Sequence, residues 1–298
     1  MVIVVSVIGG DMPKKRLATI GVRFIIAVFV NAALLAVSSA QSGSTPIVPV
    51  LDDGTPMIWT DFAASALYKD TDTRNAELKA LRIYHDNGKY DSDMRDIEKI
   101  GEAWILARSS KVTKPALVLD IDETTLTNFA EMSVDDFEYQ MDGKCPLEGD
   151  LPAPRERNEK PDVSGHIVVP CGVISWDRSA KAPAIGATKK LFNFANARGV
   201  AVFFVTGREE FERSWTAKNL DSAGFRKRAG LFMRPTGKVG FETGKVDPSA
   251  ASFKTSMRLA IENMGYHIIL NVGDQLSDLS GGHADQALKY PNPFYRLQ

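Results

Sequence analysis

Four short, uninterrupted apolar runs constrain the fold of this 298-residue chain more than any other feature. They span residues 116–119, 200–205, 230–233 and 267–272. Runs of this length without polar alternation are typical of strands that are buried on both faces of a parallel sheet. Segments of helical periodicity lie between them at 184–198 and 252–264, and Gly199 and Gly265 follow these segments. The sequence therefore predicts an α/β fold, a parallel sheet flanked by helices.

The composition excludes several other classes of protein. The chain is 44% hydrophobic and 24% charged, which is globular and allows one large domain or two smaller ones. Two cysteines are too few for a disulfide-dense scaffold. A formal net charge of −1 argues against a partner that is a nucleic-acid polymer, because such proteins normally carry a basic excess.

The first forty residues have the parts of a secretory signal peptide. A basic cluster (Lys14, Lys15, Arg16 and Arg23) precedes an apolar run at 24–37, and the small residues at 38–40 follow it. This run is shorter than the roughly 20 residues that cross a membrane. We predict cleavage after Ala40 and an exported protein, periplasmic or secreted, without a stable membrane anchor. An uncleaved N-terminal anchor and a true start at Met12 remain open.

The rest of the chain is predicted to form two parts. Residues 41–112 read as a flexible leader followed by helices, with helical periodicity over 59–107. Asp91, Ser92 and Asp93 can cap the second of these helices. We expect the helices to pack on the domain that follows and to take no part in chemistry. Residues 113–298 hold the predicted sheet, with an insertion at about 129–183 after the first strand.

Polar residues follow the predicted strands where each one ends. Because ligands of parallel sheets bind at the carboxyl ends of the strands, these residues are the candidates for a site. Clustered carboxylates need a counter-ion, and oxygen ligands without His or Cys favour Mg²⁺ over zinc. The candidates are Asp120, Asp122 and Thr124 after the first run, Thr206, Gly207 and Arg208 after the second, Lys254 opening the later helix, and Asp274 and Asp278 after the fourth run.

This order of motifs resembles the haloacid-dehalogenase (HAD) superfamily of aspartate-nucleophile phosphatases. More narrowly, it is similar to the branch that holds secreted acid phosphatases of the class B and class C type and plant vegetative storage proteins. The stretches that carry the resemblance lie at 117–128, 202–208, 271–279 and 289–295, within a region that begins near Tyr84. The resemblance implies a HAD-like Rossmannoid sheet with a substrate-covering cap in the insertion.

The resemblance also implies a function: an exported, Mg²⁺-dependent acid phosphatase that hydrolyses phosphomonoesters through an aspartyl-phosphate. Asp120 is the expected nucleophile, and Asp122 is expected to protonate the leaving alcohol and then to activate water. Protonation of the leaving alcohol requires part of Asp122 to be protonated at working pH. The expected metal ligands are Asp120, the Asp122 backbone carbonyl and Asp274, and Asp278 either binds the metal directly or holds a metal-bound water. The expected phosphate-binding groups are Thr206, the Gly207 amide and Lys254. Thr124 either shapes the loop or contacts substrate, and Arg208 either forms a structural salt bridge or takes part in the site.

Two predictions concern the cap. Trp176 is the best candidate to wall a substrate pocket, ahead of Phe129, Phe137 and Tyr139, although aromatic side chains here are also typical of a cap core. Cys145 and Cys171 bracket an irregular loop rich in proline, glycine and charge. In an exported protein this arrangement predicts a disulfide between them.

The alternatives differ in what happens at the site. The presence of Asp122 favours a phosphatase over a dehalogenase. Nucleoside 5′-monophosphates are candidate substrates if an aromatic pocket stacks a base, and a phosphotransferase would use the same residues with an alcohol as acceptor. A catalytically silent storage or binding protein is the third alternative, and the presence of Asp120, Lys254 and Asp274 counts against it. The sequence leaves the oligomeric state open.

Overall fold

The structure is a computed structural model that describes residues 71–137, 159–161, 168–170, 172–236 and 250–295. The predicted signal peptide at 1–40, Tyr139, and the predicted disulfide between Cys145 and Cys171 lie outside these residues. The chain divides into units 1–43 and 44–298, and all described residues belong to the second. Within the described ranges, no helix has the length and apolar character needed to span a membrane.

The predicted parallel sheet is confirmed. Its five strands lie in the order β5-β4-β1-β6-β7, and all neighbours are parallel. Four of them correspond to the apolar runs, whereas the short fifth strand, which contains Lys289, was not predicted. The strands are β1 (Pro115–Leu119), β4 (Ala201–Glu209), β5 (Gly230–Arg234), β6 (His267–Gly273) and β7 (Ala287–Lys289).

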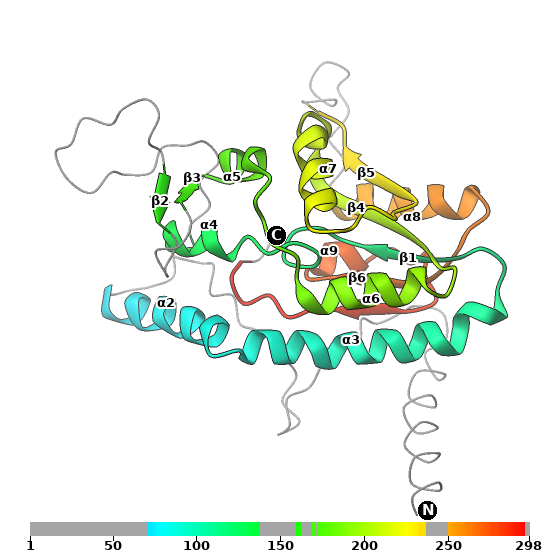
Figure 1. The fold of residues 1–298 in the computed structure, drawn as a ribbon, viewed down its shortest axis with the longest axis horizontal. Helices are drawn as coiled ribbons and strands as arrows, with labels where there is room; N and C mark the ends of the chain where they lie inside the picture. The colour runs from blue at the N-terminus through cyan, green and yellow to red at the C-terminus, as the bar shows by residue number, and fades with distance from the viewer. Residues whose placement is uncertain (1–70, 138–158, 162–167, 171, 237–249, 296–298) are drawn as a thin grey trace, which may run out of the picture. The chain divides into compact units, whose positions relative to one another are not determined.

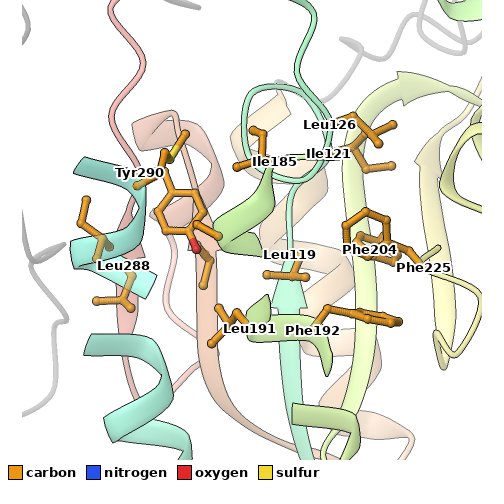
Figure 2. Packing of buried hydrophobic residues seen from close by; sticks show 14 of the residues in the cluster. Leu119, Ile121, Leu126, Ile185, Leu191, Phe192, Phe204, Phe225, Leu288 and Tyr290 are labelled. Atoms are coloured by element: carbon orange, nitrogen blue, oxygen red, sulfur yellow. The ribbon is translucent and has the colours of Figure 1, made fainter. Parts of the chain in front are cut away.

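Helices cover both faces of the sheet (Figure 1). Leu117 and Leu119 of β1 belong to the hydrophobic cluster that includes α3 (Lys89–Arg108) and α6 (Gly186–Asn196). The alternate residues Ala116 and Val118 join a second cluster with α8 (Ala250–Asn263). Figure 2 shows the first cluster, where Leu191 and Phe192 of α6 lie over the sheet near Leu119. This two-sided burial explains why β1 has no polar alternation.

The N-terminal helices, α2 (Thr71–Asp86) and α3, pack on the core as expected. Trp104 of α3 donates its indole N–H to the Ile269 carbonyl of β6 at 2.6 Å. Gly101 lets α3 approach closely, because a Cβ there would lie 3.2 Å from Leu191 Cδ1. The predicted cap of α3 was wrong: the helix begins after Gly88, whose φ of 81° suits glycine, and Asp93 lies inside the helix. The helix therefore begins before the polar residues that were expected to cap it.

The insertion after β1 contains only short elements in its described parts. They are α4 (Phe129–Val134), an antiparallel pair formed by β2 (Glu159–Pro161) and β3 (Val168–Pro170), and α5 (Val173–Ser179). The remaining short elements of the core are η2 (Ser109–Lys111), η3 (Glu210–Glu212), α7 (Arg213–Ser222) and α9 (Leu276–Leu279).

Candidate active site

The candidate site lies where the strand order changes direction. From β1 the chain continues to β4 and β5 on one side of the sheet and then returns to β6 on the other side. Such a switch point leaves a crevice at the carboxyl ends of the strands. Asp120 follows β1 and Asp274 follows β6, and the Asp120 amide donates to the Val272 carbonyl at 3.0 Å. Adjacent parallel strands therefore bring these two carboxylates to one edge.

Three buried carboxylates and one lysine form the centre of the site. Ligand oxygens of Asp120, Asp274 and Asp278 lie within 4.8 Å of one another. Lys254 Nζ lies 2.6 Å from Asp120 Oδ1 and 2.5 Å from Asp278 Oδ1. Lys254 lies in the second turn of α8 and does not open it, because this helix begins at Ala250. The sequence prediction that these four residues converge is confirmed.

The electrostatics of this cluster favour an added cation. Burial raises the pKa of Asp120 well above its usual value, with the attraction of Lys254 opposing this and the repulsion of Asp278 adding to it. Burial and Asp278 also raise the pKa of Asp274. The pKa of Lys254 is raised although burial opposes it, because Asp120 and Asp278 attract its ammonium group. The donors are all carboxylate oxygens, so the cluster fits a hard divalent cation such as Mg²⁺.

Neutral side chains hold Asp274 in place. Thr124 Oγ1 donates to Asp274 Oδ1 at 2.9 Å. The side-chain amides of Gln275 and Asn292 each donate to Asp274 Oδ2 at 2.7 Å. Asn292 belongs to the C-terminal tail and stands between Pro291 and Pro293, which restrict the backbone around it. Partners of this kind fix the orientation of a metal-binding carboxylate.

Asp278 depends on a close approach to the end of β6. A Cβ at Gly273 would lie 2.3 Å from Asp278 Cβ, so a larger residue there would displace this carboxylate. The Gln275 backbone amide donates to Asp278 Oδ2 at 2.8 Å, and Arg258 Nη1 donates to the Asp278 carbonyl at 2.6 Å. Both oxygens of Asp278 are therefore oriented, one by Lys254 and one by the backbone.

Asp122 has a different environment from Asp120, two residues away. Arg208 Nη2 lies 2.6 Å from Asp122 Oδ1, Arg208 Nε lies 3.1 Å from both oxygens, and Asn128 Nδ2 donates to Oδ1 at 2.8 Å. Burial would raise the pKa of Asp122, but Arg208 and Asn128 outweigh it and the pKa is lowered. This direction is opposite to the one expected for a group that carries a proton at working pH.

The end of β4 contributes Thr206, Gly207 and Arg208, which lie in the strand itself instead of following it. Thr206 is buried, and its hydroxyl oxygen accepts the Arg208 amide at 3.1 Å, which leaves the hydroxyl proton available as a donor. Arg208 also pairs with Asp177 of α5, with Nη2 2.9 Å from Asp177 Oδ1. The salt-bridge reading of Arg208 is therefore confirmed, and the salt bridge involves a proposed catalytic carboxylate.

The described aromatic residues of the insertion, Phe129, Phe137 and Trp176, belong to the hydrophobic core or pack against it. The side chain of Trp176 is 1% exposed and donates its indole N–H to Asn128 Oδ1 at 2.9 Å. Its packing and hydrogen bond are those of a core residue, and its role as a wall of the substrate pocket stays a prediction. Phe129 stacks on His85 with ring centroids 3.5 Å apart, and Phe137 stacks on Phe294 at 5.8 Å.

Sequence reasoning missed the residues that hold the carboxylates. Asn128 and Asp177 contact Asp122 or its partner Arg208, and Asn292 contacts Asp274. The only signal for Asn292 was its place in the tail at 289–295. This stretch carries part of the family resemblance, but no role was expected for any residue in it. Asn128 ends the first motif region, and Asp177 follows Trp176; neither residue type is distinctive without its contacts.

Comparison with known proteins shows that the C-terminal part of the chain is similar to one family. Residues 174–298 match the model of the HAD superfamily, subfamily IIIB (acid phosphatase). Thr206, Lys254, Asp274 and Asp278 lie inside this segment, whereas Asp120 and Asp122 precede it. The predicted resemblance to HAD acid phosphatases is confirmed, over a shorter region than the one expected from Tyr84 onward.

Two plant proteins are similar to this chain in sequence. Acid phosphatase 1 of Solanum lycopersicum is 36% identical over 123 residues, which are 41% of this chain and 46% of that protein. The stem 28 kDa glycoprotein of Glycine max is 33% identical over 125 residues, which are 41% of this chain and 47% of that protein. The match therefore spans about half the length of these curated relatives.

A solved structure shares the fold. The class C acid phosphatase from Bacillus anthracis superposes with a TM-score of 0.51 at 19% sequence identity, covering 75% of this chain and 86% of that one. This likeness extends over more of the chain than the family model does and confirms the HAD-like α/β fold.

Proposed function

We propose that this chain, whose residues 174–298 match the HAD subfamily IIIB acid phosphatases, hydrolyses phosphomonoesters through an aspartyl-phosphate on Asp120. One observation carries the proposal: Asp120, Asp274, Asp278 and Lys254 converge at the switch point of the sheet, with Asp122 beside them. A nucleophilic carboxylate, a cation site and an acid–base group are what phosphoryl transfer through an aspartate requires.

The first step forms the intermediate. Lys254 binds Asp120 Oδ1, while Asp120 Oδ2 has no hydrogen-bond partner among the described residues, so Oδ2 is the oxygen that attacks phosphorus. As the new P–O bond forms, the bond from phosphorus to the ester oxygen breaks, and a proton passes from Asp122 to that oxygen. The products are the free alcohol and the aspartyl-phosphate. Thr206, the Gly207 amide and Lys254 donate to the phosphoryl oxygens.

The second step reverses the role of Asp122. A water molecule attacks phosphorus and gives a proton to the Asp122 carboxylate, and the bond from phosphorus to Asp120 breaks. Inorganic phosphate leaves, and the carboxylate of Asp120 is restored. The ionised state that Arg208 favours at Asp122 suits this step. Asp120, Asp274, Asp278 and the Asp122 backbone carbonyl would hold a Mg²⁺ ion, whose positive charge would offset the charge of the phosphoryl group.

Three further parts of the proposal concern export, the metal and the substrate. Export is supported by the basic, apolar and small-residue pattern of 1–40. Mg²⁺ is supported by the oxygen-only donor set. A preference for nucleoside 5′-monophosphates would need an exposed aromatic surface, but Trp176 and Phe129 are buried. We therefore propose phosphomonoesters as the substrate class and include 5′-nucleotides in the test.

The deciding experiment measures phosphate release. The substrates are p-nitrophenyl phosphate and a panel of 5′-nucleotides and alkyl phosphates at pH 5–7, with Mg²⁺ or with EDTA. Metal-dependent release by wild type that Asp120→Asn abolishes would support the mechanism. An added alcohol that becomes phosphorylated would indicate a phosphotransferase. No release from any substrate would leave a storage or binding protein as the better reading.

A further inference from the structure

Two adjacent residues of α5 reach the same carboxylate by separate routes. Trp176 and Asp177 both lie on this helix, which follows the insertion in the chain, and both are buried. Neither contacts substrate-binding residues of the cation cluster directly. Each contacts one residue that in turn contacts Asp122, so the two routes converge on the proposed acid–base group.

The first route passes through an amide. The Trp176 indole N–H donates to Asn128 Oδ1 at 2.9 Å, and Asn128 Nδ2 donates to Asp122 Oδ1 at 2.8 Å. An indole N–H is only a donor, so it requires the amide oxygen of Asn128 to face it. The amide nitrogen must then face Asp122. Trp176 thus sets which end of the Asn128 side chain meets the carboxylate.

The second route passes through a guanidinium. Arg208 Nη2 lies 2.9 Å from Asp177 Oδ1 and 2.6 Å from Asp122 Oδ1. The arginine side chain is buried, and Thr216 Oγ1 lies 3.4 Å from Nη1. The planar, permanently charged fork of arginine holds its two carboxylate partners in a fixed relative orientation. The contact with Asp177 is an ion pair without a hydrogen bond, so Asp177 acts by attracting the buried guanidinium that also holds Asp122.

The two oxygens of Asp122 accept different numbers of hydrogen bonds from these routes. Oδ1 accepts Asn128 Nδ2 at 2.8 Å, Arg208 Nη2 at 2.6 Å and Arg208 Nε at 3.1 Å. Among the described residues, Oδ2 accepts only the 3.1 Å contact from Arg208 Nε. The side chain of Asp122 is 27% exposed, so a substrate can reach it. One oxygen is anchored and the other remains open to exchange a proton.

We propose that Trp176 and Asp177 are positioning residues that anchor Asp122 Oδ1 through Asn128 and Arg208 and leave Oδ2 as the oxygen that transfers the proton. The inference rests on the proposed function, because it concerns the acid–base step of that reaction. It assigns α5 a role in the chemistry in place of the substrate wall that the sequence predicted for Trp176. Small displacements of a catalytic group have large kinetic costs, which makes such anchoring measurable.

The test uses the dependence of rate on the leaving group. An alkyl phosphate needs a proton on its leaving oxygen, whereas p-nitrophenolate leaves with little help. Trp176→Phe removes the indole N–H and keeps most of the ring volume, and Asp177→Asn replaces the carboxyl group that faces Arg208 with an amide of the same shape. We expect either variant to lower kcat/KM for an alkyl phosphate by about tenfold more than for p-nitrophenyl phosphate. Asp122→Asn should shift this ratio further, and adding Trp176→Phe to it should change nothing more.

Trp104→Phe is the matched control. Trp104 is partly buried and also donates its indole N–H, to the Ile269 carbonyl at 2.6 Å, which lies outside both routes to Asp122. Trp104→Phe should lower stability without changing the ratio of kcat/KM for the alkyl phosphate to kcat/KM for p-nitrophenyl phosphate. Circular dichroism first checks that Trp176→Phe and Asp177→Asn are folded. If wild type is active and both variants have the same leaving-group ratio as Trp104→Phe, this inference is overturned and the proposed function stands. If wild type has no phosphatase activity, the proposed function and the inference are both overturned. If Trp176→Phe fails to fold, Asp177→Asn decides.

Discussion

The candidate site has two sides that differ in how their charges are balanced. On the cation side, Asp120, Asp274 and Asp278 share Lys254. With all four groups ionised, this side carries a net charge of −2. On the acid–base side, Asp122 and Asp177 share Arg208, and the amide of Asn128 adds a neutral donor. Burial raises the pKa of Asp177 to about 8, although Arg208 opposes this, so with Asp177 protonated this side carries no net charge.

The difference indicates what each side needs from outside the protein. Burial and neighbouring carboxylates raise the pKa values of Asp120 and Asp274, so the cation side is expected to favour the binding of protons or of a cation. The pKa of Asp122 is lowered because Arg208 and Asn128 outweigh its burial, so on the acid–base side protein groups alone favour the ionised Asp122. A divalent cation is therefore expected to change the cation side and to leave the acid–base side nearly unchanged.

The largest expected effect is on the nucleophile. Asp120→Asn removes the attacking oxygen charge and should lower phosphate release by about three orders of magnitude or more, since loss of a nucleophile removes the covalent route. The measurement is the initial rate with p-nitrophenyl phosphate and Mg²⁺. Circular dichroism should confirm that the variant is folded. Retention of more than a tenth of the wild-type rate would mean that Asp120 is not the nucleophile.

Removal of divalent cations should separate the two sides. EDTA should lower the rate by about a hundredfold or more. Saturating Mg²⁺ should raise Tm, by about 5–10 °C at a hundredfold excess over Kd. Because the raised pKa values let protons compete with the cation, the rise in Tm should be larger at pH 7 than at pH 5. Differential scanning calorimetry with and without Mg²⁺ at pH 5 and pH 7 measures the rise in Tm, and the phosphate-release assay measures the effect of EDTA.

Substitutions on each side make this prediction specific. Asp274→Asn should abolish the Mg²⁺-dependent rise in Tm, because it removes a ligand of the cation side. Asp177→Asn should leave the rise in place, because Asp177 contacts only the acid–base side. An equal loss in both variants would show that the two sides are one electrostatic unit, and the comparison would then fail.

The sequence predicted the cation side better than the acid–base side. Asp120, Asp274 and Asp278 follow strands, and strand ends of one parallel sheet must meet, so topology alone brings them together. Asn128 and Asp177 lie in the insertion, where periodicity is short and the relevant contacts depend on tertiary packing. The burial of the Trp176 ring depends on the same tertiary packing, so the sequence left both a pocket wall and a cap core open for it.

The C-terminal tail offers a smaller test of the cation side. Asn292→Ala removes one of the two amide donors to Asp274 Oδ2 and should weaken Mg²⁺ binding by about tenfold, as is usual for residues that orient a metal ligand. Isothermal titration calorimetry measures this constant. Asn219→Ala is the control, because Asn219 is also a buried amide but bonds the backbone of Ala182. Equal Mg²⁺ affinity in the two variants would refute a role for the tail in the site.

The smallest expected effect concerns a buried carboxylate outside both sides, which shows whether burial alone explains the behaviour of the cation side. Burial and a hydrogen bond with Glu102 raise the pKa of Glu98 on α3 to about 7. The folded state therefore binds more protons than the unfolded state between about pH 4.5 and pH 7, so this group's contribution to stability falls as pH rises through that range. Glu98→Gln should raise Tm relative to wild type by about 2–4 °C at pH 8 and by less at pH 5. Because Glu98 pairs with Lys190 and lies outside the cation cluster, Mg²⁺ should raise Tm equally in both proteins. A smaller Mg²⁺ effect in Glu98→Gln would mean that the cation acts by relieving buried charge throughout the domain, and the two-sided description of the site would be wrong.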